Sequence, residues 1–480
     1  MSEEVSFDRF HPLDFALCHR MKSFRALSIE SRSAFVFGLL VGLVAIAYVP
    51  PAVTFDGPSH FFRAVQISHG QFRSTRYSDS KLGGNVPHED SQFIHTLWTS
   101  YWEKHNFLRT SDWSGIASMA PGNGQMDREE FTNTAVYSPA NYVPQCIGMI
   151  ASRIFTRSPL WEHRLACAAN LACYLLLVVS FLEAADALRP SLVLIATSPL
   201  ILIQAASENT DGVNFAIPVV LFALVWRLRR DPPEDCRFRL FLGFVLTLYI
   251  ALLKPTEIAC LGFLFFIPSA CFGSRKIKLI WLSCSLFTAG AAWLCWNGPY
   301  FDVNIAKWFD PGHPPIHEQK AWLLSHPGDF ARAFLNFIGD GFCVQWGLFY
   351  GGVGGWISDR LLYFLLRLSH YLLAVLLLIP LCASKRDLRW ATANGLLAGF
   401  LLLFISVTLW VSYGVRDFGY IPYLGGRYLF LVYTFCIAAW SSLFNGWIPS
   451  LAKPLMCVGL IINSIGAGLI LASIAQRTSG

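Results

Sequence analysis

The sequence SAFVFGLLVGLVAIAYVPPAVTF fills residues 33–55 and contains no charged side chain. An apolar stretch of about 20 residues is long enough to cross the hydrocarbon core of a bilayer as a helix. The residues that follow, DGPSHFFRAVQISHGQF (56–72), at once present Asp56, His60 and Arg63. The stretch therefore predicts a membrane span that ends at a polar segment. This segment is either a solvated loop or an active site held against the membrane face.

The composition of the whole chain is typical of a polytopic membrane protein. Of its 480 residues, 54% are hydrophobic and 14% are charged, whereas about 25% of residues are charged in ordinary soluble domains. The net charge of +6 fits basic loops on one side of a membrane and does not indicate nucleic acid. The 13 cysteines include no CxxC pair, and most lie in apolar segments, so neither a disulfide framework nor a metal knot is predicted.

Eleven segments are apolar enough to be predicted as spans, and two of them are short and separated by Lys254-Pro255. They are 34–52, 165–186, 190–207, 212–228, 239–253, 256–273, 278–297, 360–383, 390–412, 428–446 and 454–475. The fold class expected is an all-α polytopic membrane protein. The interrupted pair predicts a broken or re-entrant unit, which is tolerated where protein or water covers the backbone.

The basic residues fix the orientation of these spans. With eleven spans, the basic segments 227–239, 274–278 and 384–389 share one side with residues 1–33, and the positive-inside rule makes that side cytoplasmic. A single transmembrane domain then covers 34–475, and residues 476–480 end outside. Two large outer loops follow, about 53–163 and about 298–359. The weak apolar stretch 137–155 is interpreted as an amphipathic helix lying on the outer membrane surface.

Three candidate site residues open the first outer loop. Asp56, His60 and Arg63 are spaced i, i+4 and i+7 and so share one helix face. A carboxylate partly desolvated at the interface is suited to general-base work. His60 and Arg63 would orient it or contact a head group. The alternative for Asp56 is a plain helix cap, with Pro58 in the first turn.

The other candidates lie in later segments of the same predicted face. Asp211, in SENTDGVNF, is either a helix cap or a second acid of an outer cavity. Lys254 is a candidate phosphate ligand, or else it is neutralised by Glu257. Arg367 lies about two turns inside a span, where a polar cavity or an anionic ligand would explain it. Arg427 follows Gly425-Gly426 and is either a phosphate ligand or an interfacial anchor.

These motifs resemble those of a known family. The segment FDGPSHFFRAVQISHGQF, the LKPTE element and the LGGRYLF element resemble a family of uncharacterised bacterial membrane proteins. The layout is also similar to that of the GT-C glycosyltransferases, including aminoarabinose transferases and protein O-mannosyltransferases. The resemblance covers nearly the whole chain, and it implies a GT-C-like fold in the bacterial cytoplasmic (inner) membrane with a cytoplasmic N-terminus.

The resemblance implies a lipid-linked sugar transferase. Its donor would be a polyprenyl-phosphate-linked sugar, and its acceptor an envelope glycan, lipid or protein. Asp56 would be the catalytic base, Lys254 and Arg427 would hold the carrier phosphate, and Asp211 would line the pocket. The second acid usual in that family is Gly57 here, which argues against a divalent metal held at this place. Two alternatives remain: a transporter or flippase of a lipid-linked glycan, and a degenerate, non-catalytic protein of the same layout.

Overall fold

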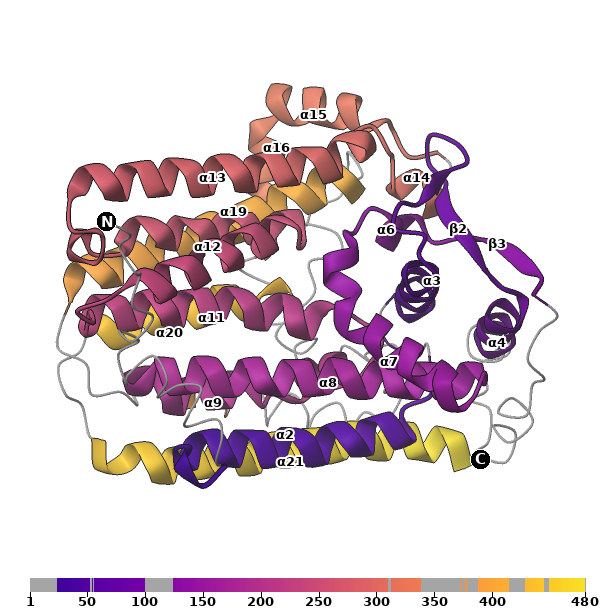
Figure 1. Cartoon of the computed structure of the whole chain (residues 1–480). Helices are drawn as coiled ribbons and strands as arrows, with labels where there is room; N and C mark the ends of the chain where they lie inside the picture. Colours follow the sequence, from indigo (N-terminus) through magenta and orange to yellow (C-terminus); the bar gives the residue numbers. More distant parts are fainter. Residues whose placement is uncertain are drawn as a thin grey trace, which may run out of the picture.

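The computed structural model describes residues 24–51, 54, 56–99, 124–309, 312–337, 372, 376–377, 387–413, 428–443 and 449–479. Within these residues the chain is mostly helical, and its long helices lie side by side in a bundle (Figure 1). The predicted span 360–383 falls almost entirely outside the described residues, as do Arg367 and Arg427.

Six helices in the described part of the chain are long and apolar enough to cross a membrane. They are α2 (Ile29–Tyr48), α8 (Pro159–Ala184), α11 (Asp211–Arg230), α13 (Arg275–Asn297), α19 (Leu388–Tyr413) and α21 (Pro449–Ser479). Each overlaps a predicted span. The structure therefore supports a multi-pass membrane protein with six candidate spans, and it does not show eleven.

The other predicted spans are shorter or broken. The stretch 190–207 forms two short buried helices, α9 (Arg189–Ala196) and α10 (Pro199–Ala205). Pro199 explains the interruption, because a proline disfavours helical backbone at the residue before it. The predicted span 428–446 is represented by α20 (Phe430–Leu443), which is shorter than a typical span.

The predicted break at Lys254-Pro255 is confirmed. Helix α12 (Arg237–Ala251) ends before it, and Pro255–Phe266 continues as the 3₁₀ helix η5, followed by η6 (Ser269–Phe272). A 3₁₀ segment of this length is unusual. Side chains bond the backbone at both ends of the interruption: Asn141 Nδ2 donates to the carbonyl of Leu252 at 2.8 Å, and Lys278 Nζ donates to that of Ile267 at 2.6 Å.

Small residues allow the bundle to pack closely. A Cβ atom at Gly38 of α2 would lie only 2.6 Å from Leu175 Cδ2 of α8, and one at Gly42 would overlap Leu171. Small residues four positions apart let membrane helices approach closely. At the start of α2, the Ser28 hydroxyl donates to Glu183 Oε1 at 2.7 Å and fixes the position of α2 beside α8.

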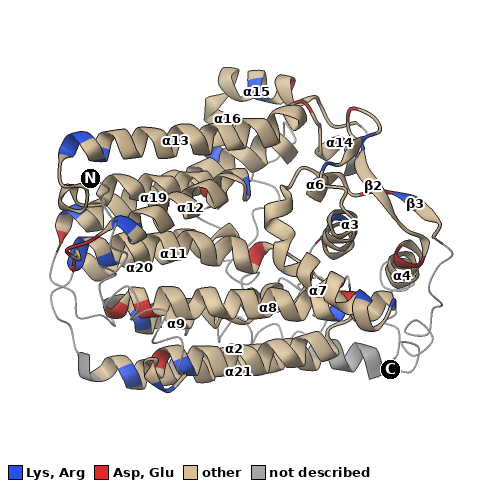
Figure 2. Ribbon diagram, viewed as in Figure 1, with Lys and Arg blue, Asp and Glu red and all other residues tan. Residues whose placement is uncertain are grey.

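Basic residues gather at one end of the bundle, opposite α3 and the strands (Figure 2). At this end Arg230 pairs with Asp186 at 2.9 Å, and Arg229 pairs with Asp387 before α19. These ion pairs tie together loops that are distant in sequence. The clustering agrees with the prediction that the short basic loops share one side, and the cytoplasmic assignment of that side stays a prediction.

The opposite end carries a small subdomain that corrects the all-α expectation. Its strands β1 (Thr75–Arg76), β2 (Leu82–Pro87) and β3 (Met126–Glu130) form an antiparallel sheet in the order β1-β2-β3. Helices α3 (Gly57–Ser68) and α4 (His88–Trp98) lie beside the sheet and cross the direction of the bundle helices (Figure 1). The sequence of β2, LGGNVP, lacks the alternation that reveals a strand. Its register is set by β3, whose residues follow their partners, from Pro87↔Met126 to Gly83↔Glu130, only after a long intervening segment.

Two further groups of short helices complete this end. Short helices α6 (Thr132–Ala135) and η3 (Pro139–Tyr142) lead into α7 (Val143–Phe155). The second loop contributes η7 (Gly298–Tyr300), α14 (Ala306–Phe309), α15 (Ile316–Ser325) and α16 (Pro327–Asn336). Trp322 and Phe330 of this loop pack on Trp410 near the end of α19, with ring centroids 6.1 and 5.9 Å apart.

Helix α7 has the character expected of a helix in the membrane interface. Its exposed side chains are apolar, with Ile147, Ile150 and Ile154 at 61%, 51% and 74% exposure, while Gln145 and Ser152 are buried. This reverses the usual pattern of a water-exposed helix, and it places the apolar face where lipid can cover it. At 13 residues the helix is also too short to span a bilayer.

Candidate functional site

Asp56 stands at the start of α3 with a strained backbone. Its φ of 58° and ψ of 15° lie in the left-handed region, and it is the one non-glycine residue with positive φ among those described. Its side chain makes no capping hydrogen bond to the helix; it accepts from Asn133 Nδ2 at 3.0 Å instead. The geometry therefore does not support the plain-cap interpretation. Strain of this kind costs about 1–3 kcal/mol and is concentrated at functional sites.

His60 and Arg63 lie on the buried face of α3 and both contact Tyr137. The His60 ring lies 6.0 Å from that of Tyr137, and its Nδ1 is 2.9 Å from the hydroxyl of Tyr142. Arg63 is fully buried and donates to the carbonyl oxygen of Tyr137 at 2.9 Å and to that of Phe72 at 2.8 Å. Burial lowers the pKa of Arg63 to about 10, which still leaves it cationic at neutral pH. These contacts fit a residue that positions Tyr137.

Lys254 forms a buried ion pair with Asp211. Lys254 follows α12, Asp211 opens α11, and both are nearly inaccessible, at 5% and 7% exposure. The alternative partner named from sequence, Glu257, is not the one within ion-pair distance. The Lys254 ammonium also lies 5.5 Å from the ring of Tyr137 and 5.4 Å from that of Tyr428. Both distances are within the range of cation–π attraction.

A small pocket of about 20 Å³, enough for roughly one water molecule, adjoins this pair. One wall is polar and is formed by the ends of α11 and η5, and the other is apolar and comes from α19 and α20. The lining residues are Asp211, Asn214, Phe215, Lys254, Thr256, Glu257, Leu401, Ile405, Tyr428, Phe430 and Leu431. Convergent polar groups beside an apolar wall are typical of small-molecule sites, and in this form the pocket has space for a small group only.

Tyr137 joins the two parts of the site. Burial raises the pKa of its phenol above the usual range, and the charges of Lys254, Asp211 and Asp56 all act on it. The structure thus brings Asp56, His60, Asp211 and Lys254 around one tyrosine. Arg427 and Arg367 lie outside the described residues. Tyr428, the residue after Arg427, lies in the pocket wall.

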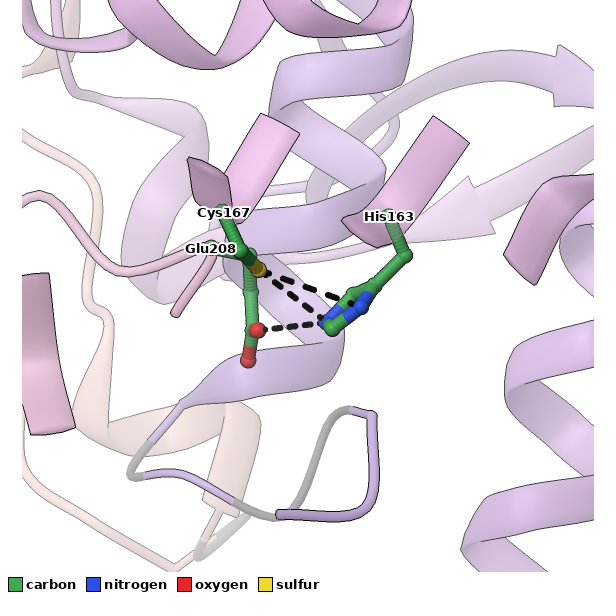
Figure 3. Close-up of side chains that lie close together, drawn as sticks. All are labelled: His163, Cys167 and Glu208. Atoms are coloured by element: carbon green, nitrogen blue, oxygen red, sulfur yellow. Dashed lines mark hydrogen bonds and ion pairs between the residues drawn. The ribbon is translucent and has the colours of Figure 1, made fainter. Parts of the chain in front are cut away.

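Sequence reasoning missed Tyr137 and a second polar cluster. His163 and Cys167 of α8 lie beside Glu208, with all three side chains buried (Figure 3). Within the described ranges this is the one group of three metal-ligating side chains found close together. The sequence does contain a signal for it: His163 and Cys167 are four residues apart, which places them on one helix face. Nothing local points to Glu208 as the third member.

Residues 39–435 match a family described as predicted membrane proteins (DUF2142). The chain belongs to this family. The match covers most of the chain and includes every candidate site residue named from the sequence. It confirms the resemblance to a family of uncharacterised membrane proteins, and it carries no named activity. No curated protein and no solved structure shows a significant match to the chain.

Proposed function

We propose that this family member is a membrane glycosyltransferase. It moves a sugar, with inversion, from a polyprenyl-phosphate carrier to a hydroxyl of an envelope glycan, lipid or protein. The observation that carries the proposal is the grouping around Tyr137 of the carboxylate of Asp56, whose backbone is strained, and the buried ammonium of Lys254. Both lie at the end of the bundle opposite the basic loops. Because the positive-inside rule places basic loops in the cytoplasm, the end that carries Asp56 and Lys254 is extracytoplasmic in this proposal.

Asp56 is the general base of the proposed reaction. Its carboxylate takes the proton of the acceptor hydroxyl, and the oxygen attacks the anomeric carbon of the sugar. The bond between that carbon and the phosphate oxygen breaks, and polyprenyl phosphate leaves. The hydrogen bond from Asn133 Nδ2 at 3.0 Å aims one carboxylate oxygen, and the left-handed backbone of Asp56 fixes its direction.

In this proposal the phosphate of the carrier binds at the pocket beside Lys254, which widens to admit it. The ammonium offers N–H donors to the phosphate, and its positive charge stabilises the leaving group. Asp211 and the rings of Tyr137 and Tyr428 hold the ammonium in place. The apolar side chains of α19 and α20, among them Leu401 and Phe430, suit the first isoprene units. Arg427 is expected to add a second phosphate contact.

The decisive experiment is a transfer assay on the full chain reconstituted in lipid nanodiscs. The probes are undecaprenyl-phosphate-linked hexoses and pentoses, and the readout is the release of undecaprenyl phosphate together with labelled sugar on an envelope acceptor fraction. Because a general base contributes about 10²–10⁴-fold, Asp56→Asn should reduce kcat by that factor. Lys254→Met should weaken carrier binding and raise KM.

The matched control is Asp79→Asn. Asp79 lies in the same subdomain, but its side chain is 93% exposed, so this variant should retain wild-type transfer. Full activity of Asp56→Asn in the same assay would refute the catalytic assignment. Movement of the carrier between leaflets of proteoliposomes, with no transfer to any acceptor, would identify a lipid-linked glycan transporter instead.

A further inference from the structure

A buried polar cluster lies where α8 meets the loop before α11. His163 Nε2 lies 2.8 Å from Glu208 Oε2, and Cys167 Sγ lies 3.6 Å from the same ring nitrogen (Figure 3). The three residues are 6%, 1% and 1% exposed. The ligand atoms of all three lie within 4.8 Å of one another.

We propose that His163, Cys167 and Glu208 bind one divalent ion of the zinc class. A thiolate, an imidazole and a carboxylate are ligands that Zn²⁺ prefers, at metal–ligand distances of about 2.0–2.3 Å. Ligand atoms around such an ion are separated by roughly 3.3–3.8 Å in tetrahedral geometry. The 2.8 Å separation of Nε2 and Glu208 Oε2 must widen to admit the ion. Because Cys167 Sγ lies 3.6 Å from Nε2 and 3.8 Å from Nδ1, the imidazole ring must also turn so that Nε2 faces the ion.

The charge and proton balance is favourable for a buried site. The ion's two positive charges are matched by the carboxylate of Glu208 and the thiolate of Cys167, so no net charge is buried. Binding forms the metal–sulfur bond and releases the thiol proton of Cys167 to solvent. His163 binds as a neutral imidazole, with its proton on the nitrogen that does not bind the metal.

Neighbouring side chains form hydrogen bonds that hold Glu208 and its loop in place, as residues around a metal site usually hold the metal ligands. The Thr54 hydroxyl donates to Glu208 Oε1 at 2.7 Å, which leaves Oε2 directed toward His163. Asn170 Nδ2 donates to the carbonyl of Asn209 at 2.8 Å, and Gln145 Nε2 donates to the same carbonyl at 3.3 Å. The loop that carries Glu208 is thus fixed from two helices.

Because of where the cluster lies, a bound metal would help to position the two acids of the proposed site. Thr54 is two residues before Asp56, and Glu208 is three residues before Asp211. An ion at Glu208 would tighten the link between the two segments that carry these acids. This positioning role rests on the proposed transferase function, whereas metal binding itself does not.

The test measures metal on the full chain purified in detergent from cells grown with added zinc. About one equivalent of Zn²⁺ per chain is expected by elemental analysis, and Cys167→Ser should lose most of it. After exchange with Co²⁺, the wild type should show the charge-transfer absorption of a cobalt–thiolate bond, and Cys167→Ser should not. The matched control is Cys173→Ser on the same helix, because Cys173 lies outside the cluster and its loss should change neither readout.

A second measurement covers the case in which Cys167→Ser folds poorly. Zn²⁺ returned to chelator-treated wild type should raise Tm, whereas Mg²⁺ at the same concentration should not. Substoichiometric zinc together with no cobalt–thiolate band in the wild type would overturn the proposal and leave a hydrogen-bonded network. Metal content and absorption do not depend on turnover, so an inactive but metal-loaded protein would refute only the transferase proposal.

Discussion

The buried pair of Lys254 and Asp211 allows a prediction whose magnitude follows from its burial. Removing one partner of a buried ion pair costs about 3–5 kcal/mol because the other charge is left uncompensated. That cost has a ceiling, since the stranded group can change its protonation state. An aspartic acid of ordinary pKa, about 3.9, costs about 4 kcal/mol to protonate at pH 7, and a lysine of pKa about 10.4 costs about 5 kcal/mol to deprotonate.

The two single variants should therefore respond to pH in opposite directions. In Lys254→Met the stranded carboxyl of Asp211 can be protonated, and the ceiling falls to about 1.5 kcal/mol at pH 5. The defect of this variant should shrink as the pH falls. In Asp211→Asn the stranded ammonium can lose its proton, so that defect should shrink as the pH rises. The double variant removes both members of the pair, so its loss of unfolding free energy should be several kcal/mol smaller than the sum of the two single losses.

The assay is equilibrium unfolding of the purified full chain in mixed detergent micelles, followed by tryptophan fluorescence at several pH values between 5 and 9. The coupling energy comes from the double-mutant cycle of the four proteins. Additive losses, with a coupling below about 0.5 kcal/mol, would show that the pair does not form in the folded protein. Parallel pH dependence of the two single variants would refute the reasoning as well.

Three further predictions concern other parts of the chain. Gly42→Leu should lower the unfolding free energy by about 1–3 kcal/mol through overpacking of α2 on α8, whereas Gly399→Leu, with open space around it, should not. Asp56→Gly should relieve about 1 kcal/mol of left-handed strain yet abolish transfer, which a thermal shift and the nanodisc assay would show together. Burial, followed by the charge of Glu162, raises the pKa of Asp90 well above its usual range. Folding therefore takes up a proton there, so Asp90→Asn should match or exceed wild-type Tm at pH 8, and the difference should vanish near pH 4.

The features predicted correctly from sequence depend on local chemistry. An uninterrupted run of about 20 apolar residues forms a helix in a bilayer because its backbone groups must bond within the segment, whereas the run 190–207, interrupted by Pro199, forms two short helices. Proline has no N–H, so the break at Lys254-Pro255 is also local. The stretch 137–155 was predicted as an amphipathic helix because counting it as a span would place the basic loops outside. The structure has the amphipathic helix α7 there, at Val143–Phe155, and its place on the outer membrane surface stays a prediction.

The features that were missed depend on distant partners. The pairing of Lys254 with Asp211 rather than Glu257 depends on where α11 packs against the break. Arg63 was expected to orient Asp56 or to contact a head group, and its hydrogen bond to the carbonyl oxygen of Tyr137, 74 residues away, was not foreseen. The β2–β3 register likewise depends on β3, a strand that no local sequence pattern predicts.

The sequence by itself determined that this chain is a multi-pass membrane protein, where its polar segments interrupt the apolar ones, and which acids and bases lie near the ends of spans. Only the tertiary structure decided that Asp56 is strained and bonded to Asn133, that Tyr137 links it to Lys254, and that His163, Cys167 and Glu208 meet. The physical reason is the distance along the chain over which each feature is determined. Insertion into a bilayer is decided segment by segment, whereas a site is made by side chains from several segments that only packing brings together.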